Sequence, residues 1–239
     1  MDTERGHKIQ AMFDRISPRY DLLNRLLSGG QDMRWRRKAV AMLGDLQGKT
    51  ALDLCSGTGD FLQIFRELYG PDITLYGADF AYQMLILAGK RHKAKNDPGL
   101  VLCQADAMFL PFEDNSLDAV TIGFGIRNVV DRPKALKDIL RTLRPGGKLV
   151  IIEPSIPKNR LIGIPFSFYF KHIMPFIGGL ISGDRAAYKY LDSSVTAFPS
   201  PGNFVRLLKE AGFTDAKACP QLFGTAQIYF GEAGIHIEL

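Results

Sequence analysis

The segment 51–60, ALDLCSGTGD, constrains the fold more than any other part of this chain. Residues Thr50–Leu54 are apolar and bounded by turn residues, a pattern typical of a buried parallel strand. Gly57 and Gly59 follow, and they allow the backbone to turn sharply and to approach a ligand closely. The next helix, expected over Asp60–Tyr69, points its N-terminal amides at whatever lies over the turn. The segment therefore predicts a nucleotide-type site.

The spacing of the glycines narrows the kind of nucleotide. A dinucleotide fingerprint needs a third glycine three positions after the second, where this chain has Leu62. The arrangement from Asp53 to Gly59 instead resembles the first motif of class I S-adenosylmethionine methyltransferases. A glycine pair alone also fits a tight strand-to-helix turn in an ordinary α/β domain. The elements that follow must decide between these interpretations.

Acidic residues follow the next two predicted strands. Asp79 stands at the end of strand 73–78, and Asp106 and Ala107 follow strand 100–104. In an open α/β sheet, ligands bind beyond the carboxyl ends of the strands. There Asp79 can accept both ribose hydroxyls, and Asp106 can meet an adenine amino group. Any one of these residues alone fits a helix cap or a turn. Their recurrence at successive strand ends favours an adenosine site.

Strands and helices alternate over residues 49–155, which predicts a doubly wound parallel sheet that forms the donor-binding core. Further strands are expected at 117–123 and 148–153. A final helix, 202–211, and two last strands, 213–219 and 226–231, complete a seven-stranded sheet within residues 201–231. The last strand is typically antiparallel in the class I methyltransferases.

Residues 1–48 are helical in pattern, with Ile9, Met12, Phe13 and Ile16 on one face, and they predict an N-terminal helical cover. Residues 156–200 are strongly apolar but interrupted by prolines and glycines, which argues against a membrane span. We expect an inserted substrate cap there, although a plain covering layer for the core also fits. We expect the whole chain, 1–239, to form a single domain.

Charge and cysteine content restrict the environment of the chain. The net charge of +5 and the isoelectric point near 9.1 are compatible with nucleic acid, with anionic lipid or with an ordinary solvated surface. The three cysteines lack metal-ligand spacing, and no metal site is expected. The polar N-terminus does not resemble a secretory signal. We expect a cytoplasmic protein.

Longer motifs identify a family. The segment 20–35, YDLLNRLLSGGQDMRW, and the segment 144–155, RPGGKLVIIEPS, resemble the two signatures of the ubiquinone/menaquinone biosynthesis C-methyltransferases. Residues 125–128 and 188–199 also resemble that family, and the resemblance extends from about Ile9 to Gly231. The chain departs from the family at Asp32, where a histidine is usual, and at Ser193, where a glutamate is usual.

The resemblance implies a class I α/β fold, S-adenosyl-L-methionine (SAM) as cofactor, and methylation of a ring carbon of a polyprenylated quinol. Demethylmenaquinol is the first candidate, and a benzoquinol of ubiquinone synthesis is the alternative. The implied donor-binding residues are Asp53, Gly57, Thr58, Gly59, Asp79, Asp106, Ala107, Gly123 and Tyr20.

Two residues after the fourth strand are the candidates for catalysis. A ring carbon becomes nucleophilic when the neighbouring hydroxyl loses its proton, and a buried cation favours that ionised form. Arg127 is the candidate cation, and Asn128 is a candidate hydrogen-bonding partner in proton transfer. Arg127 is a poor base because it stays protonated. The structural alternative pairs Arg127 with Asp131. Tyr20 either packs on the donor and helps to close the pocket or has only a structural role at a helix terminus.

Other classes of function remain open at this level. A nucleic-acid methyltransferase fits the basic charge, but the amino-directed enzymes have an N/D-P-P-Y/F motif where this chain has Gly123-Phe-Gly-Ile. We therefore expect no nucleic-acid partner. A binding module without activity is the other alternative. Contact with the inner face of the membrane is a hypothesis from the apolar cap and the lipid substrate, and a homodimer is left open.

Overall fold

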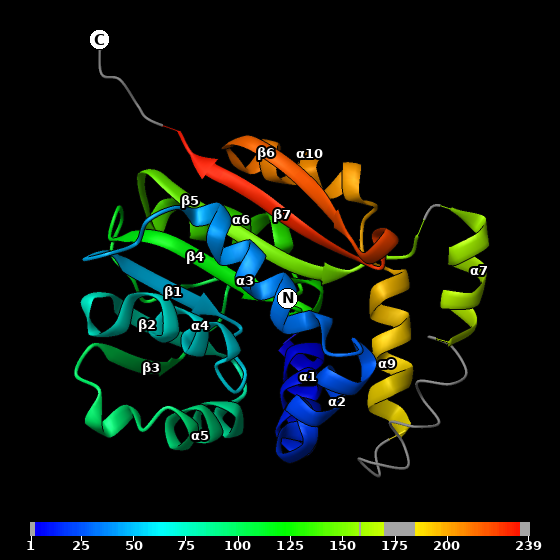
Figure 1. Ribbon diagram of the computed structural model, residues 1–239, viewed down its shortest axis with the longest axis horizontal. Helices are drawn as coiled ribbons and strands as arrows, with labels where there is room; N and C mark the ends of the chain where they lie inside the picture. The colour runs from blue at the N-terminus through cyan, green and yellow to red at the C-terminus, as the bar shows by residue number, and fades with distance from the viewer. Residues whose placement is uncertain (1–2, 158, 170–184, 235–239) are drawn as a thin grey trace.

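A computed structural model describes residues 3–157, 159–169 and 185–234 (Figure 1). The strands are β1 (Thr50–Leu54), β2 (Thr74–Asp79), β3 (Leu100–Gln104), β4 (Leu117–Gly123), β5 (Leu143–Pro154), β6 (Phe213–Gln221) and β7 (Ala226–Ala233). The α-helices are α1 (Thr3–Ile16), α2 (Tyr20–Leu27), α3 (Gln31–Leu43), α4 (Asp60–Tyr69), α5 (Tyr82–Arg91), α6 (Arg132–Thr142), α7 (Arg160–Phe168), α9 (Arg185–Thr196) and α10 (Pro201–Ala211). Short 3-10 turns include η1 (Ser17–Arg19), η4 (Ile126–Asn128) and η6 (Leu222–Gly224).

The strands form one seven-stranded sheet in the order β3-β2-β1-β4-β5-β7-β6. The first five strands are parallel, and β7 runs antiparallel to both of its neighbours. The order reverses between β1 and β4, which is where ligands bind in open sheets of this kind. The predicted class I, doubly wound, mostly parallel sheet is confirmed.

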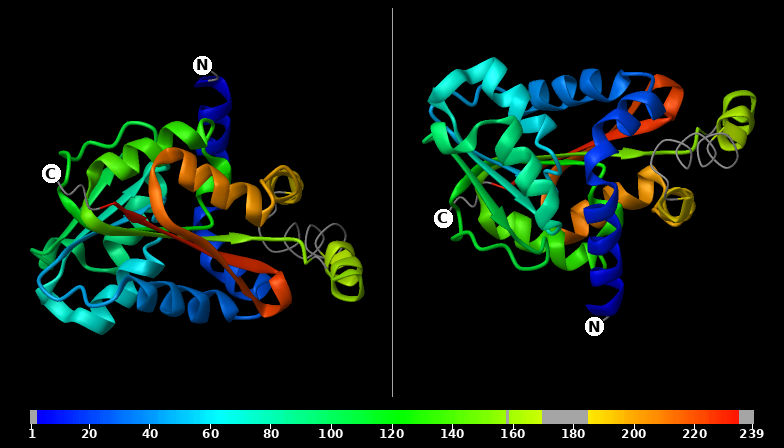
Figure 2. Two further views of the ribbon diagram at one scale, coloured as in Figure 1. Left: turned by 90° about the horizontal axis from the view of Figure 1, so that it is seen from above. Right: turned by 90° about the horizontal axis from the view of Figure 1, so that it is seen from below.

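Helices cover both faces of the sheet (Figure 2). On one face, Val40 of α3 and Phe65 of α4 pack in a cluster with sheet residues. On the other face, Ile139 of α6 and Phe204 of α10 do the same. Burial on both faces explains why most residues of β1 and β4 are apolar and do not alternate with exposed polar ones.

The strand boundaries match the sequence expectations, with one notable difference. β5 begins at Leu143, five residues before the expected Lys148, because Leu143 pairs with Leu117 ahead of an irregularity in the register. The turn η1, which contains Pro18, separates α1 from α2.

The helices α1 and α2 lie beyond the edge of the sheet where β1, β2 and β4 end (Figure 1). We call residues 3–27, from α1 to α2, the helical cover. Of the expected cap, α7 and α9 are described, and α9 contacts η4 after β4. Within the described part of the chain, no helix combines the length and the apolar character needed to cross a bilayer.

Candidate active site

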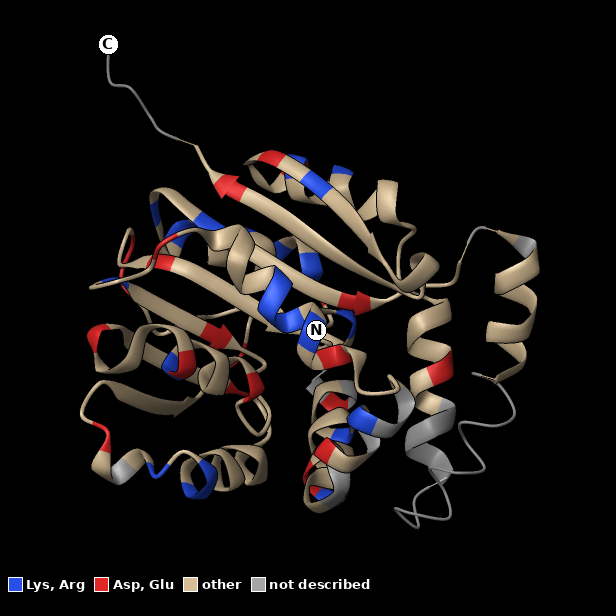
Figure 3. Ribbon diagram, in the orientation of Figure 1, with Lys and Arg blue, Asp and Glu red and all other residues tan. Residues whose placement is uncertain are grey.

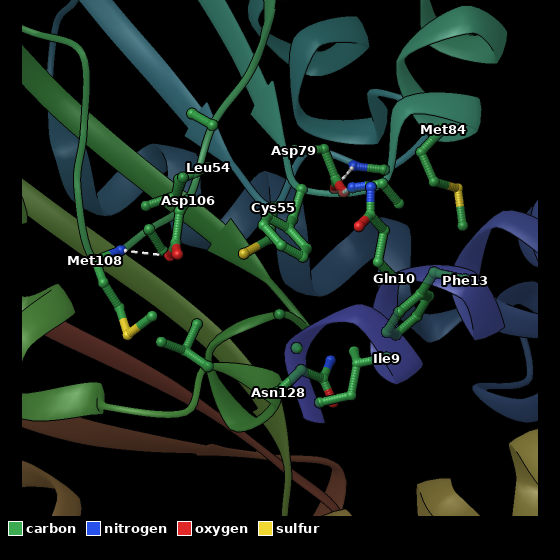
Figure 4. A pocket seen from close by; sticks show the side chains of 18 of the residues that line it. Ile9, Gln10, Phe13, Leu54, Cys55, Asp79, Met84, Asp106, Met108 and Asn128 are labelled. Carbon is green, nitrogen blue, oxygen red and sulfur yellow. Dashed lines mark hydrogen bonds between the residues drawn. The ribbon is translucent and has the colours of Figure 1, made fainter. Parts of the chain in front are cut away.

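A pocket opens at the carboxyl ends of β1 to β4, and α1 forms its outer wall (Figure 4). Each of these strands contributes the residues that follow it, as expected for a ligand crevice in a parallel sheet. The lining residues are Gly6, Ile9, Gln10 and Phe13 of α1; Leu54, Cys55 and Gly57; Asp79, Phe80, Ala81 and Met84; Ala105, Asp106, Ala107 and Met108; and Gly123, Phe124, Gly125, Asn128, Val129 and Val130.

The pocket brings together most of the predicted donor-binding residues. Gly57, Asp79, Asp106, Ala107 and Gly123 line it. The predicted residues Asp53, Thr58 and Gly59 do not line the pocket. Tyr20 is the first residue of α2, but its side chain lies outside the described part of the structure.

Residues 55–59, which we call the glycine loop, are tied to the end of β2. The amide of Gly57 donates to Asp79 Oδ2 at 2.8 Å. Both glycines have positive φ, 55° at Gly57 and 86° at Gly59. A Cβ on Gly59 would lie 2.5 Å from His92 Nε2, so a side chain at this position needs His92 to move. The sharp turn expected at these glycines is present, and Gly59 is required by packing against His92 as well as by its positive φ.

Asp79 presents a carboxylate with spare accepting capacity. Its Oδ1 accepts from the amide of Ala81 at 2.8 Å, and its Oδ2 accepts from Gly57. Each carboxylate oxygen can accept about two hydrogen bonds, which leaves one site on each oxygen for a ligand diol. Burial raises the pKa of Asp79 to about 6, although the bonds from Ala81 and Gly57 partly offset that rise. The group is therefore ionised at neutral pH.

Asp106 occupies the corresponding position after β3. Its Oδ1 accepts from the amide of Met108 at 2.9 Å, which fixes the turn that carries Ala107 into the pocket wall. Figure 4 shows this side chain beside the apolar Leu54 and Met108. Asp79 and Asp106 thus supply two polar groups to a pocket that is otherwise mainly apolar.

Asp53 has a different environment from the other two carboxylates. It is 1% exposed, its Oδ1 accepts from the hydroxyl of Thr121 at 3.0 Å, and its Oδ2 has no hydrogen-bonding partner among the described residues. Burial raises the pKa of Asp53 to about 8, against the smaller opposing effect of the bond from Thr121. Asp53 is therefore protonated at neutral pH and lies in the core under the glycine loop.

Two residues at the pocket floor adopt a backbone conformation that non-glycine residues rarely have. Cys55 follows β1 with a φ of 55°, and Phe124 follows β4 with a φ of 62°. Gly125 permits this arrangement, because a Cβ there would lie 2.3 Å from the Cβ of Cys55. Such strain persists only where surrounding structure imposes it, and it concentrates at functional sites.

Arg127 is buried behind the pocket rather than lining it. Its Nη1 donates to Glu153 Oε2 at 2.9 Å and to the carbonyl oxygen of Phe124, and its main-chain amide donates to Glu153 Oε1 at 3.1 Å. Its Nε has no hydrogen-bonding partner in the part of the chain that the structure describes. Burial raises the pKa of Glu153, and the adjacent Arg127 opposes that rise. Asp131, the structural partner considered from the sequence, instead caps α6.

Asn128 does line the pocket, and the cap holds its side chain. The hydroxyl of Tyr190, on α9, donates to Asn128 Oδ1 at 3.1 Å. This bond leaves the Nδ2 group of Asn128 as the donor end of the amide. Tyr190 belongs to a segment that resembles the family's cap, but its sequence gave no indication of this partner.

The sequence also missed the wall that α1 forms. Ile9, Gln10 and Phe13 reach the pocket from the helical cover. The shared face of Ile9 and Phe13 indicated an apolar surface, but a helical period does not say which surface it will meet. His172, the histidine within the expected cap, lies outside the described residues.

Comparisons with known proteins identify the family of the chain. The model of the ubiE/COQ5 methyltransferase family matches residues 1–233. The ubiquinone/menaquinone biosynthesis C-methyltransferase UbiE of Geobacter sulfurreducens is 46% identical over 98% of this chain and 91% of its own length. The demethylmenaquinone methyltransferase of Thermus thermophilus is 45% identical over 92% of this chain and 99% of its own.

Solved structures show the same fold at low identity. A SAM-dependent methyltransferase from Thermotoga maritima superposes with a TM-score of 0.64 at 19% identity, covering 93% of this chain and 98% of that one. The family match spans both the N-terminal cover and the last strand. The chain belongs to the ubiE/COQ5 methyltransferase family.

Proposed function

We propose that this protein transfers a methyl group from SAM to a ring carbon of a polyprenylated quinol, with demethylmenaquinol as the first candidate acceptor. The observation that carries the proposal is the high identity, over nearly the full chain, to relatives named for this reaction. A benzoquinol is the alternative acceptor.

The pocket has the groups that the donor requires. We assign Asp79 to the ribose hydroxyls, since its two oxygens each keep one accepting site at the end of β2. Asp106 faces the adenine end, between the apolar walls that follow β3. Gly57 and Gly123 leave room for close approach of the ligand to the backbone. Bound here, SAM supplies an electrophilic methyl group on a positively charged sulfur.

Asn128 and Arg127 are assigned to the acceptor. Asn128 orients a ring oxygen through its Nδ2 group, while Tyr190 fixes the opposite end of the amide. Arg127 supplies positive charge behind the loop that carries Asn128, and Glu153 holds the guanidinium in place. The positive charge stabilises an ionised ring hydroxyl and so makes the neighbouring carbon nucleophilic.

Methyl transfer from labelled SAM tests the proposal directly. Purified protein is incubated in detergent with labelled donor and a reduced short-tail demethylmenaquinol, a reduced benzoquinol, or bulk RNA. We expect label in a quinol fraction, with a product heavier by one methylene. Label in RNA alone, or in no acceptor while SAM still binds, would contradict the proposal.

We further propose that the cap contacts a membrane surface. Leu161 and Ile164 on α7 are 85% and 66% exposed, and Phe223 in η6 is 76% exposed. The two segments are neighbours, because Gly224 lies against Pro157 just before α7. After Arg160, its first residue, α7 carries no charged residue, as the tan ribbon in Figure 3 shows. Exposed apolar groups of this kind favour an interfacial position for a protein whose substrate has a prenyl tail.

Sedimentation with vesicles of mixed neutral and anionic lipid tests this contact. Replacing Leu161 and Ile164 by Ser should reduce the bound fraction severalfold. Leu68→Ser removes an equally apolar side chain, 55% exposed on α4, and serves as the matched control. Equal binding of both variants would contradict the assignment of the cap to the membrane.

A further inference from the structure

A connected network of charged side chains lies beside the glycine loop. It has equal numbers of acidic and basic members: Asp21, Asp32, Asp60, Arg25, Arg36 and Arg91. Arg25 bridges Asp32 and Asp60, and its Nη2 is 2.7 Å from Asp60 Oδ1. Arg36 bridges the same two carboxylates, 2.9 Å from Asp32 and 3.4 Å from Asp60. The two arginines therefore hold two acids between them.

The centre of the network is withdrawn from water. Asp32 is 0% exposed, and Arg36 and Asp60 are each 4% exposed. Burial alone would raise the pKa of Asp60, but the arginines around it lower the pKa below its ordinary value. Asp60 is therefore charged. Removing one member of such a network leaves one buried charge in excess, which is destabilising.

The network ties the helical cover to the walls of the pocket. Asp21 and Arg25 belong to α2. The hydroxyl of Thr58, in the glycine loop, donates to Asp21 Oδ1. Arg91 of α5 lies 3.2 Å from Asp21 and 3.0 Å from Asp60, the first residue of α4. One end of the cover is thus bound to the glycine loop, to α4 and to α5.

The cover has little apolar anchorage through α1. Among the α1 side chains that the structure describes, only Met12 is buried. A second polar tie exists at Asp14, whose Oδ1 accepts from the amide of Gln83 in the first turn of α5 at 3.1 Å. Yet α1 supplies Ile9, Gln10 and Phe13 to the pocket. Polar ties therefore largely set how closely this wall approaches a ligand.

We propose that the six charged residues form a latch that holds the helical cover on the pocket and sets how fast the methyl donor and its demethylated product leave. The proposal rests on the donor site proposed above. The two cations Arg25 and Arg36 need two anions to balance their charge. Asp60 is one, and Asp32, at a position where the family usually has histidine, is the other. It acts through Arg25 and does not touch the ligand, so both are positioning residues.

Arg25→Met tests the latch, because it cuts the bridge from the cover to Asp32 and Asp60. Trp35, the single tryptophan, packs edge-on at 6.5 Å against Phe124 of the pocket, so its fluorescence can report donor binding. The dissociation rate of SAM should rise roughly tenfold, which corresponds to one lost hydrogen bond to a charged group. Hydrogen exchange at residues 9–13 should also be faster in the SAM complex.

A double variant separates latching from stability. Arg25→Met leaves one anion in excess, whereas Arg25→Met with Asp32→Asn restores equal numbers of acids and bases. The double variant should recover much of the thermal stability lost in the single variant, yet still release SAM quickly. If SAM retention recovers in step with stability, Arg25 has only a structural role and the latch is wrong.

Lys8→Met is the matched control, since Lys8 is an exposed cation of the same cover that pairs only with Glu4 among the contacts described. It should leave the SAM dissociation rate and the exchange at 9–13 unchanged. If Arg25→Met releases SAM at the wild-type rate, the latch is wrong, while the proposed donor site is unaffected. A wild-type chain that binds no SAM overturns the donor site on which the latch rests.

Discussion

The carboxylate of Asp79 and the main-chain amide of Gly57 are joined by a 2.8 Å hydrogen bond that links the end of β2 to the glycine loop. The same carboxylate faces the pocket. One side chain therefore both shapes the loop and is available to a ligand. Loss of Asp79 should affect donor binding through both effects.

Asp79→Ala should lower the affinity for SAM at least tenfold, because a hydrogen bond to a charged group is worth about 1.5–3 kcal/mol. Calorimetric titration with SAM measures the change. Glu210→Ala, which removes an exposed carboxylate on α10, provides the control and should bind normally. Unchanged affinity in Asp79→Ala would remove this residue from the donor site.

The affinity for SAM should depend on pH through Asp79. Its pKa is raised to about 6, so the carboxylate accepts hydrogen bonds above pH 6 and progressively loses that ability below it. SAM affinity should therefore fall as the pH drops from 7 to 5. Asp79→Asn should bind more weakly at pH 7 and should lack this step. A step of equal size in both proteins would assign it to another group.

Asp53→Asn should change how stability depends on pH. The folded-state pKa of Asp53 is about 8, above the ordinary value of 3.8. At a pH between these two values, the folded protein therefore holds a proton that the unfolded chain has lost. This contribution to stability decreases by about 1.4 kcal/mol per pH unit between pH 5 and 8 and is gone above pH 8. Denaturant unfolding at several pH values should show that slope in the wild type relative to Asp53→Asn. Parallel curves would contradict a neutral Asp53.

Arg127→Met should lower turnover at least tenfold with little change in SAM affinity, since it removes the cation behind the acceptor site. It should also cost about 3 kcal/mol of stability, because Glu153 is left as a buried, unpaired carboxylate. Adding Glu153→Gln should restore much of that stability without restoring turnover. Recovery of turnover in the double variant would show that Arg127 acts only as a structural partner.

Tyr190→Phe should raise the KM for the quinol severalfold, because the Asn128 side chain loses the bond that fixes its orientation. SAM affinity should not change. Steady-state kinetics with each substrate varied in turn will separate the two effects. Tyr82→Phe, at an exposed tyrosine on α5, is the control. A rise in the KM for SAM instead would place Tyr190 on the donor side.

Local patterns predicted the sheet well because its central strands, β1 and β4, are buried on both faces and its strands end in turn residues. β1, β3 and β4 begin and end where the sequence indicated. The start of β5 was missed because Leu143 joins the sheet through an irregular register with Leu117, a tertiary effect that no local pattern shows.

The proposed donor end of the site was easier to predict than the proposed acceptor end. Asp79 and Asp106 follow from strand ends, where topology alone fixes the position of a side chain. Glu153 and Tyr190 come from distant segments, and their contacts with Arg127 and Asn128 depend on packing. The conformations of Cys55 and Phe124 were equally hidden, because neither residue type favours a positive φ.

The position of β7 has a consequence for synthesis of the protein. The last strand along the chain, Ala226–Ala233, lies between β5 and β6 and pairs with both. During translation, the edge of β5 therefore stays unpaired until the ribosome has released these residues. An unpaired strand edge is a template for aggregation. A nascent chain that stalls before Ala226 carries such an edge, so the sheet cannot close until β7 has been synthesised and has left the ribosome.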